Sequence, residues 1–161
     1  MMFFGNPVAA MRNVRAALKP GAELMFIAWR PLVDNAWAHV PKQVALAHLP
    51  PPGENAQTCG PGPFSMANPE VVTAQLKAAG FVDAKFERVD GPVRVGRTLD
   101  EAVAFQFAVG PAGEIVREAG VLAEARRPEV ERALRDALAR HLHDGEIVMQ
   151  SSSWTITARN P

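Results

Sequence analysis

A helix, a Pro-Gly turn and an uninterrupted apolar segment follow one another early in the chain, and this succession most restricts the fold. Asn6 and Pro7 start the helix, because the asparagine oxygen can cap the first turn and proline's fixed φ suits its first position. Pro20 and Gly21 end it, and residues 24–29 are all apolar. Such a run is typical of a strand covered on both faces, as in a parallel sheet flanked by helices. The segment therefore predicts half of a βαβ unit.

We interpret the chain as a single partial domain, residues 1–161, in which helices and strands alternate with insertions. Seven prolines fall within residues 31–68, so this stretch predicts a lid or loop around one short amphipathic segment at residues 36–49. The predicted order is a helix and core strand (1–30), the lid or loop (31–68), a helix and strand (69–96), inserted helices (97–145) and a terminal strand (146–161).

Glycines and prolines set the expected boundaries in the second half of the chain. Residues 82–89 alternate imperfectly between apolar and polar as a strand does, and Gly91 and Pro92 are expected to break that strand. One inserted helix is expected at about residues 112–125. Pro128 is expected to begin the next one, because proline suits the first position of a helix.

Charge and cysteine content argue against several classes of function. Seventeen Lys and Arg balance seventeen Asp and Glu, which argues against binding nucleic acid or an anionic membrane through net charge. The single cysteine, Cys59, excludes an intrachain disulfide and any multi-cysteine metal cluster. No stretch approaches the ~18 apolar residues of a membrane span, and the N-terminus lacks a basic leader. We therefore expect a cytoplasmic protein with no membrane or nucleic-acid partner.

The search for motifs finds no catalytic group and no metal site. Neither glycine-rich phosphate-loop pattern occurs, and there is no GxSxG elbow for a nucleophilic serine. His141 and His143 are two residues apart, which on a helix directs their side chains roughly 200° apart, the wrong geometry for a shared ion. Cys59 lies in a Pro/Gly-rich loop without a helix N-terminus to lower its pKa, so we interpret it as an ordinary loop cysteine.

Two pairs of residues are candidates for a binding site by their position. Trp29 and Arg30 end the core strand, and in an open α/β sheet the ligand crevice lies at the carboxyl ends of the strands. The alternative is a packed tryptophan beside a surface arginine. His39 closely follows Trp37 in the lid segment, where it either reaches a pocket or is a surface histidine.

Short patterns spread over nearly the whole chain carry a family resemblance. Residues 2–7 read MFFGNP, residues 18–22 read LKPGA, residues 62–64 read GPF and residues 76–81 read LKAAGF. Together they resemble the C-terminal half of a class I S-adenosylmethionine-dependent methyltransferase of the ubiquinone-biosynthesis-like type. That family has MFF-x-[DN]-P before a helix ending in L-[RK]-P-G-G, so the present chain departs from it where Ala22 replaces the second glycine.

The resemblance implies the C-terminal part of a doubly wound, Rossmann-like sheet with inserted helices and an antiparallel last strand. It also implies methyl transfer to a small-molecule acceptor with S-adenosylmethionine as cofactor. The family's cofactor motifs follow its first three strands and would precede Met1, so no cofactor-binding residue is assigned and the chain is not expected to be active alone. A fragment or a wrongly chosen start codon is favoured over a degenerate paralogue. No residue is a convincing general base, and the acceptor side would be lined by Phe4, Trp29, Arg30, Trp37 and His39.

Two other classes of function compete with the methyltransferase interpretation. One is a non-catalytic module that binds a ligand or a partner, and the other is a structural helper that pairs its sheet edge with another chain. A buried strand such as residues 24–29 normally has a neighbour on each side, and here one side is predicted to be bare. Because an unpaired apolar edge is a template for association, we expect the isolated chain to dimerise or aggregate.

Overall fold

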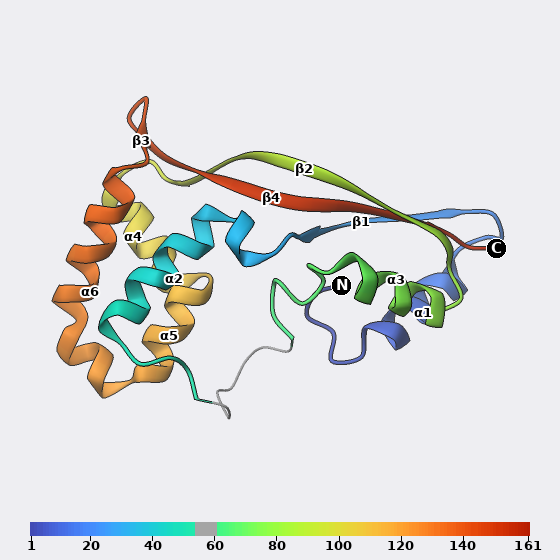
Figure 1. The fold of residues 1–161 in the computed structure, drawn as a ribbon, viewed down its shortest axis with the longest axis horizontal. Coiled ribbons are helices and arrows are strands. Elements are labelled where there is room, and N and C mark those ends of the chain that lie inside the picture. Colours follow the sequence, from blue (N-terminus) through green and yellow to red (C-terminus); the bar gives the residue numbers. More distant parts are fainter. Residues whose placement is uncertain (54–60) are drawn as a thin grey trace. The chain divides into compact units, whose positions relative to one another are not determined.

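The computed structural model describes residues 1–53 and 61–161 as an α/β protein. These residues form a four-stranded antiparallel sheet and six α-helices, which confirms the predicted α/β class (Figure 1). The chain divides into two compact units. Among the described residues, unit 1 holds residues 1–31, 61–90 and 152–161, and unit 2 holds residues 32–53 and 91–151. Cys59 lies outside the described residues.

Unit 1 is built from three strands and two helices. Helix α1 (Pro7–Ala17) precedes strand β1 (Glu23–Trp29), and helix α3 (Pro69–Ala78) precedes strand β2 (Val82–Gly96), whose first part belongs to this unit. The last strand of the chain, β4 (Glu146–Arg159), lies between the other two, in the order β1-β4-β2. It runs antiparallel to β1.

Both helices of unit 1 begin at the Asn-Pro pairs that the sequence predicts. The Asn6 side chain accepts a hydrogen bond from the Ala9 N–H at 2.9 Å, and Pro7 occupies the first turn of α1. The Asn68 side chain accepts from the Glu70 N–H at 2.8 Å at the start of α3. These side-chain oxygens satisfy backbone donors that have no partner inside the helix.

One face of the unit 1 sheet packs against α1 and α3, and the other does not. In β1, Phe26 and Ala28 face the helices, whereas Met25 and Ile27 are 67% and 65% exposed. The prediction of a strand covered on both faces is therefore wrong for the described residues, because both helices lie on the same side of β1. The core on the covered side is formed by Met11, Ala28, Met66, Val72, Leu76, Ala79, Phe81, Ile156 and Ala158.

Unit 2 packs four helices around its own core. Residues 36–49, expected as an amphipathic segment, form α2 (Ala36–His48) after the short helix η1 (Leu32–Asp34), and α2 contacts both α5 and α6. The other helices are α4 (Leu99–Ala108), α5 (Pro111–Ala119) and α6 (Val121–Ala139), and β3 (Leu142–His143) pairs with the start of β4. No helix in the described ranges is both long and apolar enough to cross a membrane.

Two predicted boundaries are wrong. β2 continues through Gly91 and Pro92, because it is an edge strand and a proline can sit there without removing a ladder hydrogen bond. The last two long helices meet at Gly120, which has a φ of +50°, and not at Pro128, which lies inside α6. A left-handed glycine turns the chain out of the helix, whereas the packing of buried Val130 and Leu134 sustains α6 beyond its proline.

Candidate functional site

The carboxyl end of β1 carries a cluster of aromatic and charged side chains within unit 1. Arg30, the residue after β1, places its Cζ atom 4.1 Å from the centroid of the Trp154 ring. The Arg30 backbone N–H donates to the Ser152 carbonyl at 3.1 Å. The Trp154 indole N–H donates to the carbonyl of Ala67 at 3.0 Å, just before α3. The guanidinium is thereby held over an aromatic face, which favours a cation.

Asp90 supplies a carboxylate to the same cluster. It accepts hydrogen bonds from the Arg88 Nε at 3.0 Å and from the Ser152 hydroxyl at 2.5 Å. The hydrogen bond from Arg88 and then that from Ser152 lower the pKa of the Asp90 carboxyl; desolvation opposes them, and the charges of Arg88 and Arg30 lower the pKa further. The carboxylate is thus ionised at neutral pH, and a proton-accepting role is not favoured by this environment.

The lowered pKa of Asp90 predicts how an Asp90→Asn variant responds to acid. A carboxyl whose folded pKa is below its unfolded value of 3.8 stabilises the fold fully above that value and loses this contribution as the pH falls through the folded pKa. We expect the variant's deficit in free energy of unfolding, measured with urea, to be constant from about pH 7 to pH 5 and to shrink below about pH 4. The exposed Asp136→Asn serves as control, and a deficit that widens in acid would contradict the assignment.

Three of the five predicted binding residues lie in unit 1. Phe4 precedes α1 and is 51% exposed. Trp29 is the last residue of β1, and strand alternation places it on the open face with Ile27. Arg30 lies over Trp154, which packs against the covered face. Trp29 and Arg30, although adjacent in the sequence, therefore lie on opposite faces of the sheet.

The other two predicted residues lie in unit 2, on α2. Trp37 is 6% exposed, its indole N–H donates to the Asn35 side chain at 3.2 Å, and its ring centroid lies 6.2 Å from that of Phe105. The buried Gln106 side chain donates to the Trp37 carbonyl at 3.1 Å. His39 lies on the same helix, and its Nδ1 atom is buried with no hydrogen-bond partner among the described residues. The structure brings these two residues together as near neighbours on α2.

Sequence analysis missed the partners of Arg30. The sequence indicates Trp154 and Ser152 only as parts of a terminal strand, and Asp90 only as the residue after another. Trp154 and Ser152 contact Arg30 because β4 pairs with β1, with Ala28 opposite Trp154, and Ser152 in turn donates to Asp90 of β2 on the other side of β4. The one available signal in the sequence is the alternation of apolar and polar residues in β4. It predicts on which face of the sheet Trp154 lies, but not which strand pairs with β4.

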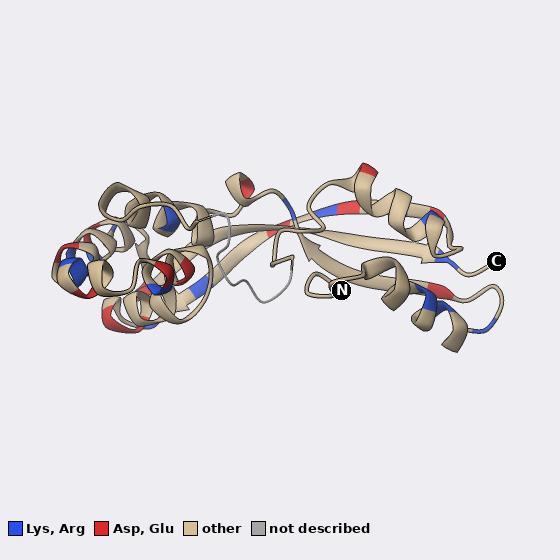
Figure 2. Cartoon of the chain, turned by 90° about the horizontal axis from the view of Figure 1, so that it is seen from below, with Lys and Arg blue, Asp and Glu red and all other residues tan. Residues whose placement is uncertain are grey.

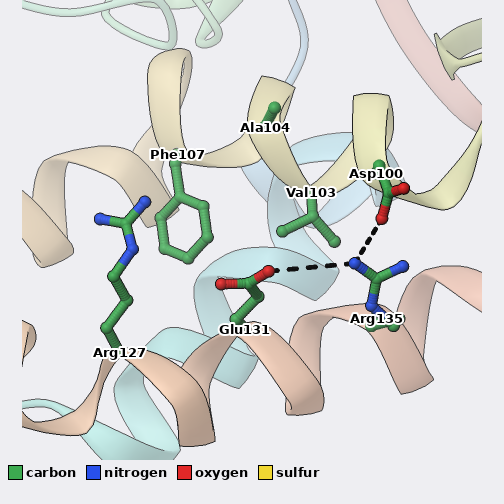
Figure 3. Close-up of a pocket in the computed structure, with 7 residues that line it drawn as sticks. All are labelled: Asp100, Val103, Ala104, Phe107, Arg127, Glu131 and Arg135. Carbon is green, nitrogen blue, oxygen red and sulfur yellow. Dashed lines mark hydrogen bonds and ion pairs between the residues drawn. The ribbon is translucent and has the colours of Figure 1, made fainter.

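A second candidate feature is a hollow of about 260 Å³ in unit 2, between α4 and α6 (Figure 3). Figure 3 shows Arg135 of α6 between two carboxylates, Asp100 at 2.5 Å and Glu131 at 3.9 Å. Farther along the same helix, the Cζ atom of Arg127 lies 4.8 Å from the centroid of the Phe107 ring. The apolar side chains lining the hollow are Val103, Ala104 and Phe107.

Neither metal ligands nor a charged face of one sign accompanies these two features. The described residues contain no group of three or more His, Cys, Asp and Glu that could hold a metal ion. Both signs of charge occur among the helices of each unit, although α1 carries only arginines and α4 only acidic residues (Figure 2). The sequence matches no known family model and no curated protein.

Proposed function

We propose that this chain is the C-terminal half of a class I S-adenosylmethionine-dependent methyltransferase with a Rossmann-like sheet, which transfers a methyl group to a small-molecule acceptor. The observation that carries the proposal is β1, which is an edge strand in the described sheet and leaves Met25 and Ile27 largely exposed. An apolar strand that is open on one edge and one face is expected where a larger sheet has been divided.

The connection from α1 to β1 indicates where the other half would pair. Nearly all strand-helix-strand crossovers between parallel strands are right-handed, and they place the two strands in one sheet with the helix on its face. A strand preceding α1 would therefore lie parallel to β1 at its open edge. The family's cofactor motifs belong to that preceding part of the sheet, as the patterns at residues 2–7 and 18–22 imply.

The described residues do not by themselves fit a cofactor site. Cofactors of this class carry ribose hydroxyls, which can donate hydrogen bonds to a free carboxylate, yet Asp90 of β2 already accepts hydrogen bonds from Arg88 and Ser152. We therefore assign cofactor binding to the preceding half and derive no step through it for this chain. On this proposal Trp29 and Arg30, at the end of β1, contribute to the acceptor side within unit 1.

Positioning of the acceptor is the part of catalysis that this chain would supply. Methyl transfer is an in-line displacement, whose rate gains from fixing two reactants and from excluding water. The stacked Arg30 and Trp154 are tied to β1, β4 and the start of α3, so they form a rigid support rather than a mobile loop. Among the described residues, no side chain is supported by its surroundings as a general base.

Calorimetric titration of the purified chain with S-adenosylhomocysteine tests the proposal. We expect no saturable binding, because the motifs that hold the cofactor belong to the other half. Circular dichroism on the same sample must show a folded protein. One-to-one binding by the chain alone would contradict the assignment of the cofactor site to preceding sequence.

The open edge of β1 also supports a second candidate function, a non-catalytic module that binds a ligand or pairs with another copy. In this case Met25 and Ile27 would meet a second chain of the same sequence rather than the first half of an enzyme. The two candidates differ in whether a longer polypeptide acquires cofactor binding.

A further inference from the structure

We propose that the hollow between α4 and α6 binds a small monocarboxylate with an apolar body, such as a single ring or a short acyl chain. This site lies wholly in unit 2 and is independent of the proposed methyl transfer. The inference follows from the one charged side chain of the lining that has no ion-pair partner among the described residues, from the apolar residues beside it and from the size of the space.

Three of the four charged side chains that line the hollow are joined in ion pairs, and the fourth, Arg127, is not. Both carboxylates, Asp100 and Glu131, lie within ion-pair distance of Arg135. Arg127 has no hydrogen-bond acceptor or ion-pair partner among the described residues, and its only recorded interaction is with the Phe107 ring. The end of the hollow formed by Arg127 is therefore positive and complementary to an anion.

The position of Arg127 over Phe107 suits it for binding a carboxylate. A guanidinium stacked on a ring keeps its N–H donors in its own plane, where they remain free to form two parallel hydrogen bonds with a carboxylate. The stacking also restricts the side chain before a ligand arrives, which lowers the entropy lost on binding. A phosphate ester is less suited, because Glu131 is also part of the lining and repels a second negative charge.

The apolar residues of the lining and the volume of the hollow determine which ligands can fit beside Arg127. Val103, Ala104 and Phe107 of α4 present apolar surface next to Arg127. The volume of about 260 Å³ is below the range of roughly 300–1,000 Å³ typical of drug-sized ligands. A single aromatic ring or a short chain therefore fits, whereas a nucleoside does not.

Titration of the full chain with 3-phenylpropionate, followed by ¹H–¹⁵N NMR shifts, tests the site. We expect saturable binding with a Kd of about 0.1–1 mM, as suits a small ligand at an open site. We expect Arg127→Gln to weaken binding about tenfold, because a charge-assisted bidentate contact is lost. Arg127→Lys should fall between the two, since it keeps the charge but not the paired donors.

The matched control is Arg132→Gln, which removes an exposed arginine from the same helix outside the hollow. It should leave the Kd unchanged, and the neutral amide 3-phenylpropanamide should bind at least about tenfold more weakly than the acid. No saturable shift up to about 10 mM ligand would overturn the proposal. So would equal binding of acid and amide, or equal weakening by the Arg127 and Arg132 variants.

Discussion

The Asn160→Ala variant is expected to lose about 3 kcal/mol of free energy of unfolding in unit 1. Asn160 is 5% exposed and its side chain joins α1 to the end of β4. Its Oδ1 accepts from Arg15 Nε at 2.9 Å, and its Nδ2 donates to the carbonyls of Leu18 and Lys19 at 3.0 and 3.2 Å. Alanine would leave these carbonyls at the helix end without their donor, and each such loss costs about 1–3 kcal/mol when it is buried.

Urea unfolding followed by tryptophan fluorescence measures this loss, since Trp29 and Trp154 both lie in unit 1. Asn13→Ala is the matched control, because Asn13 is exposed on α1 and should change stability by no more than about 0.5 kcal/mol. Equal effects of the two substitutions would mean that Asn160 does not hold the connection from α1 to β1. The placement of β1 beside β4 would then need another cause.

Self-association of the chain alone is the second large effect that we expect. In sedimentation at high protein concentration, the mass should exceed that of a monomer, because β1 has an unpaired edge in the sheet of the described residues and two exposed apolar side chains. The double substitution Met25→Lys and Ile27→Lys should shift the population to monomer. Charges on an edge strand oppose pairing with a second copy.

The control for this experiment is Val121→Lys with Leu122→Lys, which removes two exposed apolar side chains from unit 2, 82% and 43% exposed. It should leave the association unchanged. A clean monomer of the unsubstituted chain at high concentration would contradict the prediction. If both double variants reduced self-association equally, the association would be generally hydrophobic and would not depend on pairing through β1.

Local chemistry accounts for what the sequence predicted correctly. Asn6 and Asn68 start α1 and α3, because a capping oxygen and a following proline act within one helical turn. The apolar run at residues 24–29 is a strand, as expected. The expected start of a helix at Pro128 was wrong, since the packing that carries α6 through its proline involves other helices.

Long-range pairing accounts for what the sequence did not reveal. A six-residue apolar run cannot distinguish burial on both faces from burial on one, and in β1 Leu24, Phe26 and Ala28 face the helices whereas Met25 and Ile27 are exposed. In the site, Arg30 was identified from its place after a strand. Trp154 and Asp90 were not, because the contacts of Arg30 with Trp154 and of Ser152 with Asp90 depend on β4 lying between β1 and β2.

The central claim is that β1 is the open edge of a methyltransferase sheet whose cofactor-binding half precedes it. The most direct test is calorimetric titration, with S-adenosylhomocysteine, of a polypeptide extended by the in-frame codons upstream of Met1. The account predicts one-to-one binding by the extended protein and none by residues 1–161 alone. A folded, extended protein that binds no S-adenosylhomocysteine would contradict it.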